Sequence, residues 1–283
     1  MADRTPEDLG WFDGVTPDDT AAASDAIRDG SARDPRDWPT RAVESGFADD
    51  EADYYARLRD AAIEATGQAV AERERADDQQ LIHAVRSVDD AERVANELAE
   101  RVAEWAGSRG HDVAGVEGAR EVAALEPDGP TEARLVALAE RVVDMAEEAE
   151  QLRAFVRRQA PAVAPNLSAM AGPVLAARLI ALAGGLEDLA RMPSGTVQVL
   201  GAEDALFAHL RGEAAPPKHG VIFTHEYVRT TDPDERGSAA RALAGKLAIA
   251  ARIDHYAGDR RPELDAELDE RIRRIRTRGD DDE

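Results

Sequence analysis

The sequence contains no cysteine, which excludes thiol catalysis, zinc–thiolate sites and disulfide bonds. It also lacks any run of the roughly 18 to 20 consecutive apolar residues that a membrane-spanning helix requires. The first residues do not follow the basic and then apolar plan of a secretory signal peptide. We therefore expect a cytoplasmic protein that does not enter a membrane.

Lysine is nearly as scarce, because Lys218 and Lys246 are the only two in a chain of 283 residues. Aspartate and glutamate are spread along the whole length and bring the formal net charge to −23. Together with abundant alanine, such a surface is typical of a protein from a salt-rich cytoplasm, where the Debye length falls to about 3 Å at about 1 M salt. The net charge therefore indicates a halophilic habitat and says little about the ligand.

One segment departs from this acidic balance. Between residues 192 and 261, acidic and basic side chains occur in equal numbers, and both lysines lie there together with four of the six histidines. Because the rest of the chain is strongly acidic, the neutral charge balance of this segment sets it apart. We therefore look for the ligand-binding surface in this part of the chain.

Aromatic residues are also few, at 4% of the chain, whereas the helix-forming residues alanine, leucine, valine, glutamate and arginine are abundant. We predict a mainly α-helical fold. Residues 1–48 are rich in Asp, Pro, Gly and Ser and have few apolar anchors, so they should form a small, weakly cored segment. A helix is expected from about Asp49 towards Glu74.

The cleanest periodicity follows that helix. Apolar residues recur at alternating steps of three and four, first from Leu81 to Trp105 and then from Leu135 to Val156, which is the heptad pattern of a coiled coil. Several glycines and Pro130 interrupt the helix between the two runs. We predict an antiparallel coiled-coil hairpin with arms of about 38 Å, and two ordinary helices of a globular bundle are the alternative. The residues expected to mediate dimerisation through this seam are Leu81, Val88, Leu98, Val102, Trp105, Leu138, Val142, Met145 and Leu152.

Beyond the hairpin the apolar segments become shorter. A helix should start at Pro165 and continue through the buried apolar run Val174–Ala183 until Pro193 ends it. Residues 196–200 (Thr-Val-Gln-Val-Leu) are expected to be extended. Further helices are predicted to open at Gly201 and to cover residues 237–256 and 262–276, before a disordered Asp-Asp-Asp-Glu end.

Four stretches of this region carry a family resemblance, in matching order and spacing. They are APNLSAMAGPVLAARLIALAGGLEDLARMPS (164–194), TVQVLGAEDALFAHL (196–210), PPKHGVIFTH (216–225) and RGSAARALAGKLAIAARIDHYAGD (236–259). They resemble the Nop domain of archaeal box C/D scaffold proteins and of their eukaryotic nucleolar and spliceosomal relatives, and residues 78–107 look like the start of that family's coiled coil. The resemblance implies a reduced N-terminal region (1–76), a coiled-coil hairpin (77–160), an all-α Nop domain (161–262) and a charged C-terminal helix and tail (263–283).

The resemblance also implies a role. In such particles a small kink-turn-binding protein first binds a guide RNA that contains kink-turns, and the Nop domain then clamps the combined RNA–protein surface. The coiled coil pairs two scaffold copies, and the N-terminal domain docks fibrillarin, the methyltransferase that modifies ribose 2′-hydroxyl groups. This chain departs from the family in two ways: Asp204 and Ala208 replace basic residues, and the N-terminal region is shorter than the usual fibrillarin-binding domain.

Within the Nop-like segment, Lys218 and His219 lie in a Pro-Pro-Lys-His-Gly loop. An ammonium group and an imidazole on a rigid loop can contact phosphate and stack on an unpaired base, which is how single-stranded RNA is commonly recognised. Because phosphate contacts weaken steeply with salt, we expect recognition to rest on shape, on stacking and on the partner protein's surface. The predicted RNA-binding residues are Glu203, His209, Arg211, Lys218, His219, Arg236, Arg241 and Lys246.

Some of these residues also allow a structural interpretation. Glu203 can act only as a helix cap, and His209 can be a partly buried structural histidine. Lys246 can extend along the surface beside a packing glycine, Gly245, unless another backbone or a ligand approaches that glycine closely. Leu206, Phe207 and Leu210 are expected to lie in the core.

The chemistry of a catalytic site is missing from the sequence. His225-Glu226 together with His219 fits neither the HExxH motif nor a facial triad, and we find no Ser/His/Asp set or phosphate-binding loop. We predict a scaffold that is not an enzyme and uses no metal or cofactor. Two alternatives stay open: a coiled-coil adaptor that has lost RNA binding, and an enzyme that uses the histidines of the neutral segment.

Overall fold

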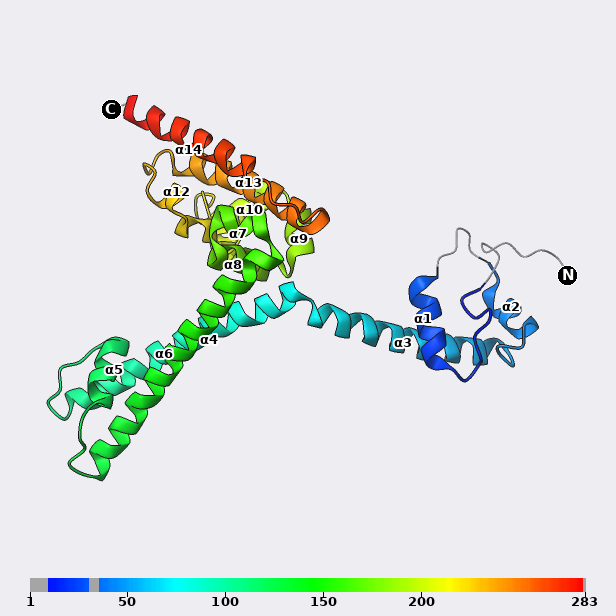
Figure 1. The fold of residues 1–283 in the computed structure, drawn as a ribbon, viewed down its shortest axis with the longest axis horizontal. Coiled ribbons are helices and arrows are strands. Elements are labelled where there is room, and N and C mark those ends of the chain that lie inside the picture. The colour runs from blue at the N-terminus through cyan, green and yellow to red at the C-terminus, as the bar shows by residue number, and fades with distance from the viewer. Residues whose placement is uncertain (1–9, 31–35, 282–283) are drawn as a thin grey trace. The chain divides into compact units, whose positions relative to one another are not determined.

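The computed structural model describes residues 10–30 and 36–281, and within them every regular element is a helix (Figure 1). This confirms the prediction of a mainly α fold. The helices are α1 (Thr20–Asp29), α2 (Trp38–Glu44), α3 (Glu51–Arg75), α4 (Asp77–Gly107), α5 (Gly115–Ala123), α6 (Pro130–Val163), α7 (Pro165–Ala171), α8 (Pro173–Ala183), α9 (Leu186–Arg191), α10 (Ser194–Val199), α11 (Glu203–Leu210), the 3-10 turn η2 (Val221–Thr224), α12 (Glu226–Arg229), α13 (Arg236–Tyr256) and α14 (Glu263–Asp281). They form two compact units, Met1–Ala76 and Asp77–Glu283.

The N-terminal unit is built on α3. Asp50 caps this helix by accepting a hydrogen bond of 2.8 Å from the backbone N–H of Asp53, and α1 is tied to it by an ion pair of 2.6 Å between Arg28 and Glu72. The few apolar anchors of this region converge on one small aromatic core, in which the rings of Trp11 and Phe47 lie 5.1 Å apart. The unit therefore has a core in spite of its polar composition.

The hairpin consists of α4 and α6, which lie side by side and run in opposite directions (Figure 1). Small residues such as Ala95, Ala99 and Ala139 are buried along the seam, and their size allows the two helix axes to approach closely. Of the residues predicted for dimerisation, Leu81, Val88, Val102 and Val142 are buried, and Leu98, Trp105, Leu138, Met145 and Leu152 are half-buried. Much of the heptad seam is thus used within one chain.

The connection between the two arms contains a helix that the glycine-rich sequence did not predict. Helix α5 packs against both α4 and α6, and its Ala119 and Val122 are buried in the core at the hairpin tip. Gly118 lies so close to the preceding loop that an added Cβ atom would come within 2.8 Å of the Val113 side chain. The glycine therefore permits α5 to close onto the tip.

Helices α7, α9, α10, α12 and α14 pack around α13, whose Leu243, Ala244 and Leu247 are fully buried. Helix α8 packs against α4 and α6 of the hairpin. The single helix predicted from Pro165 to Pro193 is instead three helices, α7, α8 and α9. The chain turns at Gly172, with φ of 78°, and again at Gly184, with φ of 93°, which are angles that favour glycine. No single helix of the described chain is apolar and long enough to span a membrane, although the bent pair of α7 and α8 would meet that test together.

The prediction of an extended segment at residues 196–200 is wrong, because residues 194–199 form helix α10. Thr196 and Val197 donate backbone hydrogen bonds to the carbonyl oxygen of Pro193, at 2.9 and 3.2 Å. Val197 is completely buried in the core that includes α13. Burial of this valine outweighs the β-propensity of Thr-Val-Gln-Val, which is a weak preference compared with packing.

The acidic C-terminal end also differs from expectation. Helix α14 continues beyond residue 276 as far as Asp281, so the first two residues of the Asp-Asp-Asp-Glu sequence are helical. The last two lie outside the described residues.

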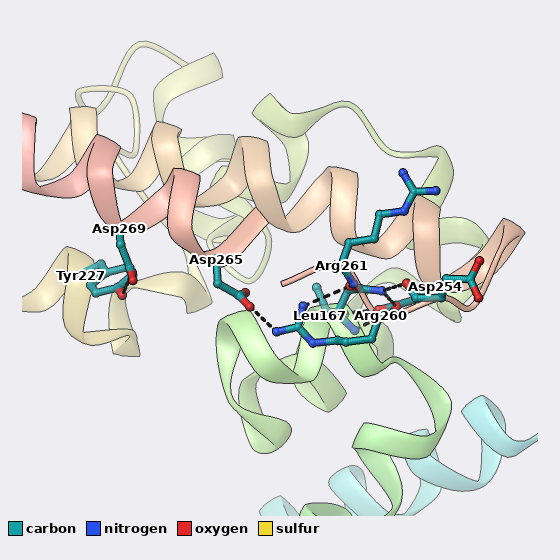
Figure 2. Close-up of polar contacts among 9 residues, drawn as sticks. Leu167, Tyr227, Asp254, Arg260, Arg261, Asp265 and Asp269 are labelled. Atoms are coloured by element: carbon teal, nitrogen blue, oxygen red, sulfur yellow. Dashed lines mark hydrogen bonds and ion pairs between the residues drawn. The ribbon is translucent and has the colours of Figure 1, made fainter. Parts of the chain in front are cut away.

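A buried polar cluster joins α7 to the end of α13 (Figure 2). The carboxylate of Asp254 accepts hydrogen bonds from the backbone N–H groups of Asn166 and Leu167, at 2.9 and 2.8 Å. The Asn166 side chain donates to Asp254 at 2.6 Å and accepts from the backbone N–H of Arg261 at 2.7 Å. Asp254 thus caps the N-terminus of a helix far away in sequence, and we call this set of contacts the Asp254 cluster.

Candidate nucleic-acid interface

The Pro-Pro-Lys-His-Gly loop is held firmly at its base. The N–H groups of Gly220 and Val221 donate to the carbonyl oxygens of Gln198 and Leu200, at 2.9 and 2.8 Å, and the Gln198 amide donates to the carbonyl oxygen of Lys218 at 2.7 Å. An added Cβ atom on Gly220 would come within 2.1 Å of the Leu200 oxygen. Only glycine can therefore occupy this position, and hydrogen bonds anchor the loop that carries Lys218 to residues 198–200.

His219 and Arg236, two of the predicted RNA-binding residues, meet at Phe223. The imidazole of His219 stacks on the Phe223 ring with centroids 4.5 Å apart and 21° between the planes. The guanidinium of Arg236 lies 5.7 Å from the centroid of the same ring and is oriented by its bond of 3.1 Å to the Thr231 carbonyl oxygen. We call His219, Phe223 and Arg236 the stacking cluster.

The electrostatics of the cluster favour a neutral histidine. Burial lowers the pKa of His219 below its usual 6.5, and the nearby positive charges of Arg236 and Lys218 lower it further. At neutral pH the imidazole is therefore an uncharged, flat group that can both accept and donate hydrogen bonds. Such a group can contact a base by stacking and hydrogen bonding without depending on charge, so salt should weaken this contact little.

Helix α11, which precedes this loop in the chain, presents apolar side chains to solvent. Phe207 is 57% exposed and Leu210 is 71% exposed, and no residue of α11 is buried. The expectation that Phe207 and Leu210 belong to the core is wrong, and Leu206 is half-buried. A helix of eight residues whose apolar side chains face outward is a surface suited to a partner macromolecule.

Three other predicted RNA-binding residues have partners within the chain. Glu203, the first residue of α11, accepts a hydrogen bond of 2.8 Å from the N–H of Gly201, which precedes the helix. The Nδ1 atom of His209 lies 3.0 Å from the Ala214 carbonyl oxygen, and Arg211 forms an ion pair of 3.0 Å with Glu213. These residues shape α11 and the loop that follows it.

Arg241 and Lys246 belong to a different surface. They line a groove of about 790 Å³ between α13 and α14, in which Lys246 forms an ion pair with Glu267. Apart from its chain neighbours and the backbone of its own helix turn, no atom lies within 4 Å of the position that a Cβ atom on Gly245 would occupy. Neither close packing nor the backbone of another element therefore explains the glycine. The structure therefore separates these two residues from the stacking cluster.

Phe223 completes the cluster, yet the sequence did not single it out. Its only signal is that it lies four residues after His219, close to a Pro/Gly-bounded loop. The contribution of Arg236 comes from the start of α13, and that proximity becomes visible only in the folded chain.

Comparisons with known proteins show which proteins this chain resembles. The family model named Nop, described as "snoRNA binding domain, fibrillarin", matches residues 130–276. A NOP5 family protein of Methanocaldococcus jannaschii is 47% identical over 142 residues, which are 50% of this chain and 34% of that protein. Nucleolar protein 58 of Candida albicans is 42% identical over 137 residues, which are 48% of this chain and 27% of that protein. The chain thus matches about a third or less of the length of these relatives.

A solved structure shares the fold. A chain in the crystal structure of a fibrillarin/Nop5p complex has a TM-score of 0.54 and 24% sequence identity, and the alignment covers 90% of this chain and 92% of that one. The family model and the two relatives confirm the resemblance proposed from the sequence. Because the family model covers more than half of its length, the chain belongs to the Nop family.

Proposed function

We propose that the chain is the RNA-binding scaffold of an archaeal box C/D-type ribonucleoprotein. It binds a guide RNA with kink-turns together with a small kink-turn-binding protein, and it positions fibrillarin for 2′-O-methylation of ribosomal or transfer RNA. The chain itself positions the other components and does not catalyse the reaction. The observation that carries this proposal is the stacking cluster, in which His219 of the anchored loop and Arg236 of α13 both contact the Phe223 ring.

The cluster suits an unpaired nucleotide. The His219 imidazole already stacks on Phe223, and a splayed base can extend that stack. Lys218 is exposed on the same loop and can reach the adjoining phosphate. The exposed Phe207 and Leu210 of α11 then contact the kink-turn-binding protein, so that RNA and protein are recognised together.

Two further contacts complete the assembly. The hairpin pairs two copies through the half-buried members of its seam, such as Leu98, Trp105 and Leu138, which already face the core of their own chain on one side. The N-terminal unit, residues 1–76, docks fibrillarin. Both contacts belong to the proposal and follow from membership of the family together with the hairpin geometry.

The test is a filter-binding titration with a kink-turn RNA, in the presence and absence of a small kink-turn-binding protein, at low and at molar salt. His219→Ala should weaken binding at molar salt about tenfold or more, because a base loses its stacking partner. Lys218→Ala should cost less at molar salt, because a single phosphate contact is then largely screened. His255→Ala, at the far end of α13, serves as the matched control.

A structural adaptor without RNA binding is the second candidate. It is favoured by the internal partners of Glu203, His209 and Arg211 and by the exposed Asp204 at the start of α11. An adaptor would not bind the kink-turn RNA under any condition of the same titration, and His219→Ala would then change nothing. Either result would refute the scaffold proposal.

A further inference from the structure

Helix α8 brings the hairpin next to the segment that carries the stacking cluster, because it packs against both α4 and η2. A pocket of about 590 Å³ lies where these elements meet. Binding sites for small molecules usually have volumes of about 300–1,000 Å³. The contacts described for the proposed function leave this pocket unused.

Most of the pocket wall is apolar. It is formed by Val85 of α4, by Ala181 and Leu182 of α8, and by Val221 of η2. Leu182 is 46% exposed, although it is a large apolar residue. An added Cβ atom on Gly201, which also lines the pocket, would come within 3.2 Å of the Leu182 side chain and 3.3 Å of the Val221 side chain. The glycine therefore keeps the space between these two residues open.

The charged residues of the pocket leave one cation without a counter-ion. Asp89 of α4, the one carboxylate on the pocket wall, forms an ion pair of 2.6 Å with Arg178 of α8. Arg86 lies three residues before Asp89 on α4, lines the same pocket and is exposed. Among the residues that the structure describes, it has no hydrogen bond or ion pair. Because the carboxylate is already neutralised, the free guanidinium favours an anionic ligand.

The pocket adjoins the stacking cluster along the chain. Gly220 and Val221, which line the pocket, directly follow His219, whose imidazole stacks on Phe223. Consecutive Cα atoms are about 3.8 Å apart, so the pocket wall begins one residue from the stack. An RNA strand whose base extends the His219 stack therefore brings its next nucleotide to this pocket.

We propose that the pocket between α4, α8 and η2 binds a second unpaired nucleotide of the RNA, next to the one that stacks on His219. The base packs on Leu182 and Val221, and its phosphate accepts hydrogen bonds from the Arg86 guanidinium. This inference rests on the proposed function and deepens it, because it adds the hairpin to the RNA-binding surface. Arg86 was not among the residues predicted from the sequence.

The phosphate contact is tested by the salt dependence of binding, with a kink-turn RNA and a small kink-turn-binding protein in the filter assay. Arg86→Ala should weaken binding about fivefold at low salt and make the slope of log affinity against log salt shallower by about 0.7, the value for one phosphate of a single strand. Arg86→Lys keeps the charge and should keep the slope. An unchanged slope in Arg86→Ala would overturn the proposal.

Arg134→Ala is the matched control for this measurement. Arg134 is also exposed and has no ion pair among the described residues, but it lies near the start of α6, at the tip of the hairpin. Its substitution removes the same charge from the same unit and should leave both affinity and slope unchanged. If Arg134→Ala changed the slope as much as Arg86→Ala, the effect would belong to the net charge and the proposal would fall.

Cross-linking identifies what occupies the pocket, since the natural sequence has no cysteine. Leu182→Cys that carries a photoactivatable aryl azide should label the RNA, at a nucleotide next to the one that Lys218→Cys labels with the same reagent. Ile63→Cys, exposed on α3, measures the background. The proposal is overturned if Leu182→Cys labels RNA no more than Ile63→Cys does. It is also overturned if Leu182→Cys labels the kink-turn-binding protein instead, which would assign the pocket to a protein side chain.

Failure of this pocket and failure of the scaffold function give different results. Leu182→Asp places a carboxylate where the base should pack, and it should weaken RNA binding at molar salt about tenfold. If His219→Ala weakens binding but Leu182→Asp and Arg86→Ala do not, the pocket proposal alone is refuted. If the natural chain does not bind the RNA at all, both proposals are refuted. Arg86 is exposed and makes no contact that the fold requires, so Arg86→Ala remains informative even if Leu182→Asp does not fold.

Discussion

The Asp254 cluster leads to a prediction about stability. The Asp254→Asn substitution preserves the volume of the side chain but replaces one carboxylate oxygen by an NH₂ group. In the structure both oxygens accept from backbone N–H groups, those of Asn166 and Leu167, and one also accepts from the Asn166 amide. Whichever way the new amide turns, at least one buried N–H group loses its acceptor and faces another donor.

The expected cost follows from these contacts. A buried donor left without an acceptor costs about 1–3 kcal/mol, and a bond to a carboxylate is stronger than one to a neutral amide. We therefore expect Asp254→Asn to lower the free energy of unfolding of the unit 77–283 by about 2–4 kcal/mol. Guanidinium unfolding followed by circular dichroism measures this change.

Asp259→Asn provides the matched control. It makes the same chemical change five residues away. The Asp259 side chain is exposed, and only the backbone carbonyl oxygen of this residue takes part in the cluster. It should alter the free energy of unfolding by less than about 0.5 kcal/mol. Hydrogen exchange should also rise at the amides of Asn166 and Leu167 in the Asp254 variant only. A cost below about 1 kcal/mol for Asp254→Asn would refute the assignment of the cluster as a helix cap.

Two further predictions concern the candidate interface, and a third concerns His225, two residues after Phe223. Gly220→Ala should destabilise the fold by about 1–3 kcal/mol, because the new methyl group collides with the Leu200 carbonyl oxygen; chemical unfolding measures this, and an unchanged midpoint would contradict it. Burial lowers the pKa of His225 below its usual 6.5, so its contribution to stability is complete above 6.5 and is lost as the pH falls through the lower pKa of the folded state. The unfolding midpoint should therefore fall less steeply between pH 8 and pH 5 in His225→Asn than in the natural chain, and equal slopes would argue against this assignment. Replacing Phe207 and Leu210 together by serine should change the free energy of unfolding by less than about 0.5 kcal/mol yet weaken binding to the complex of RNA and kink-turn-binding protein about tenfold; a marked loss of stability with full binding would return these residues to the core.

The sequence was sufficient to predict the hairpin and the long helices. Apolar steps of three and four define a helix face wherever they continue over several turns, and they did so from Leu81 to Trp105. Short segments were harder because local preference and packing compete there. Residues 196–200 favour a strand by composition, yet the burial of Val197 decides for a helix.

The candidate site shows the same limit. Lys218 and His219 were identified because a Pro/Gly-bounded loop is a local feature of the sequence. Phe223 and the position of Arg236 beside it depend on how α13 packs, which no local pattern encodes. For Phe207 and Leu210, helical periodicity shows that a face is apolar but does not show whether the core or a partner covers it.

Helix α5 has a mechanical consequence for the hairpin. Two helices with a repeating seam can slide past each other by one heptad, about 10.5 Å at 1.5 Å per residue, and still match apolar with apolar. Because α5 buries Ala119 and Val122 against residues of both arms, such as Val102 and Ala139, one register alone satisfies all three helices. The arms therefore form a spacer of defined length, and the tip stands at a set distance along the hairpin from the domain that carries the stacking cluster.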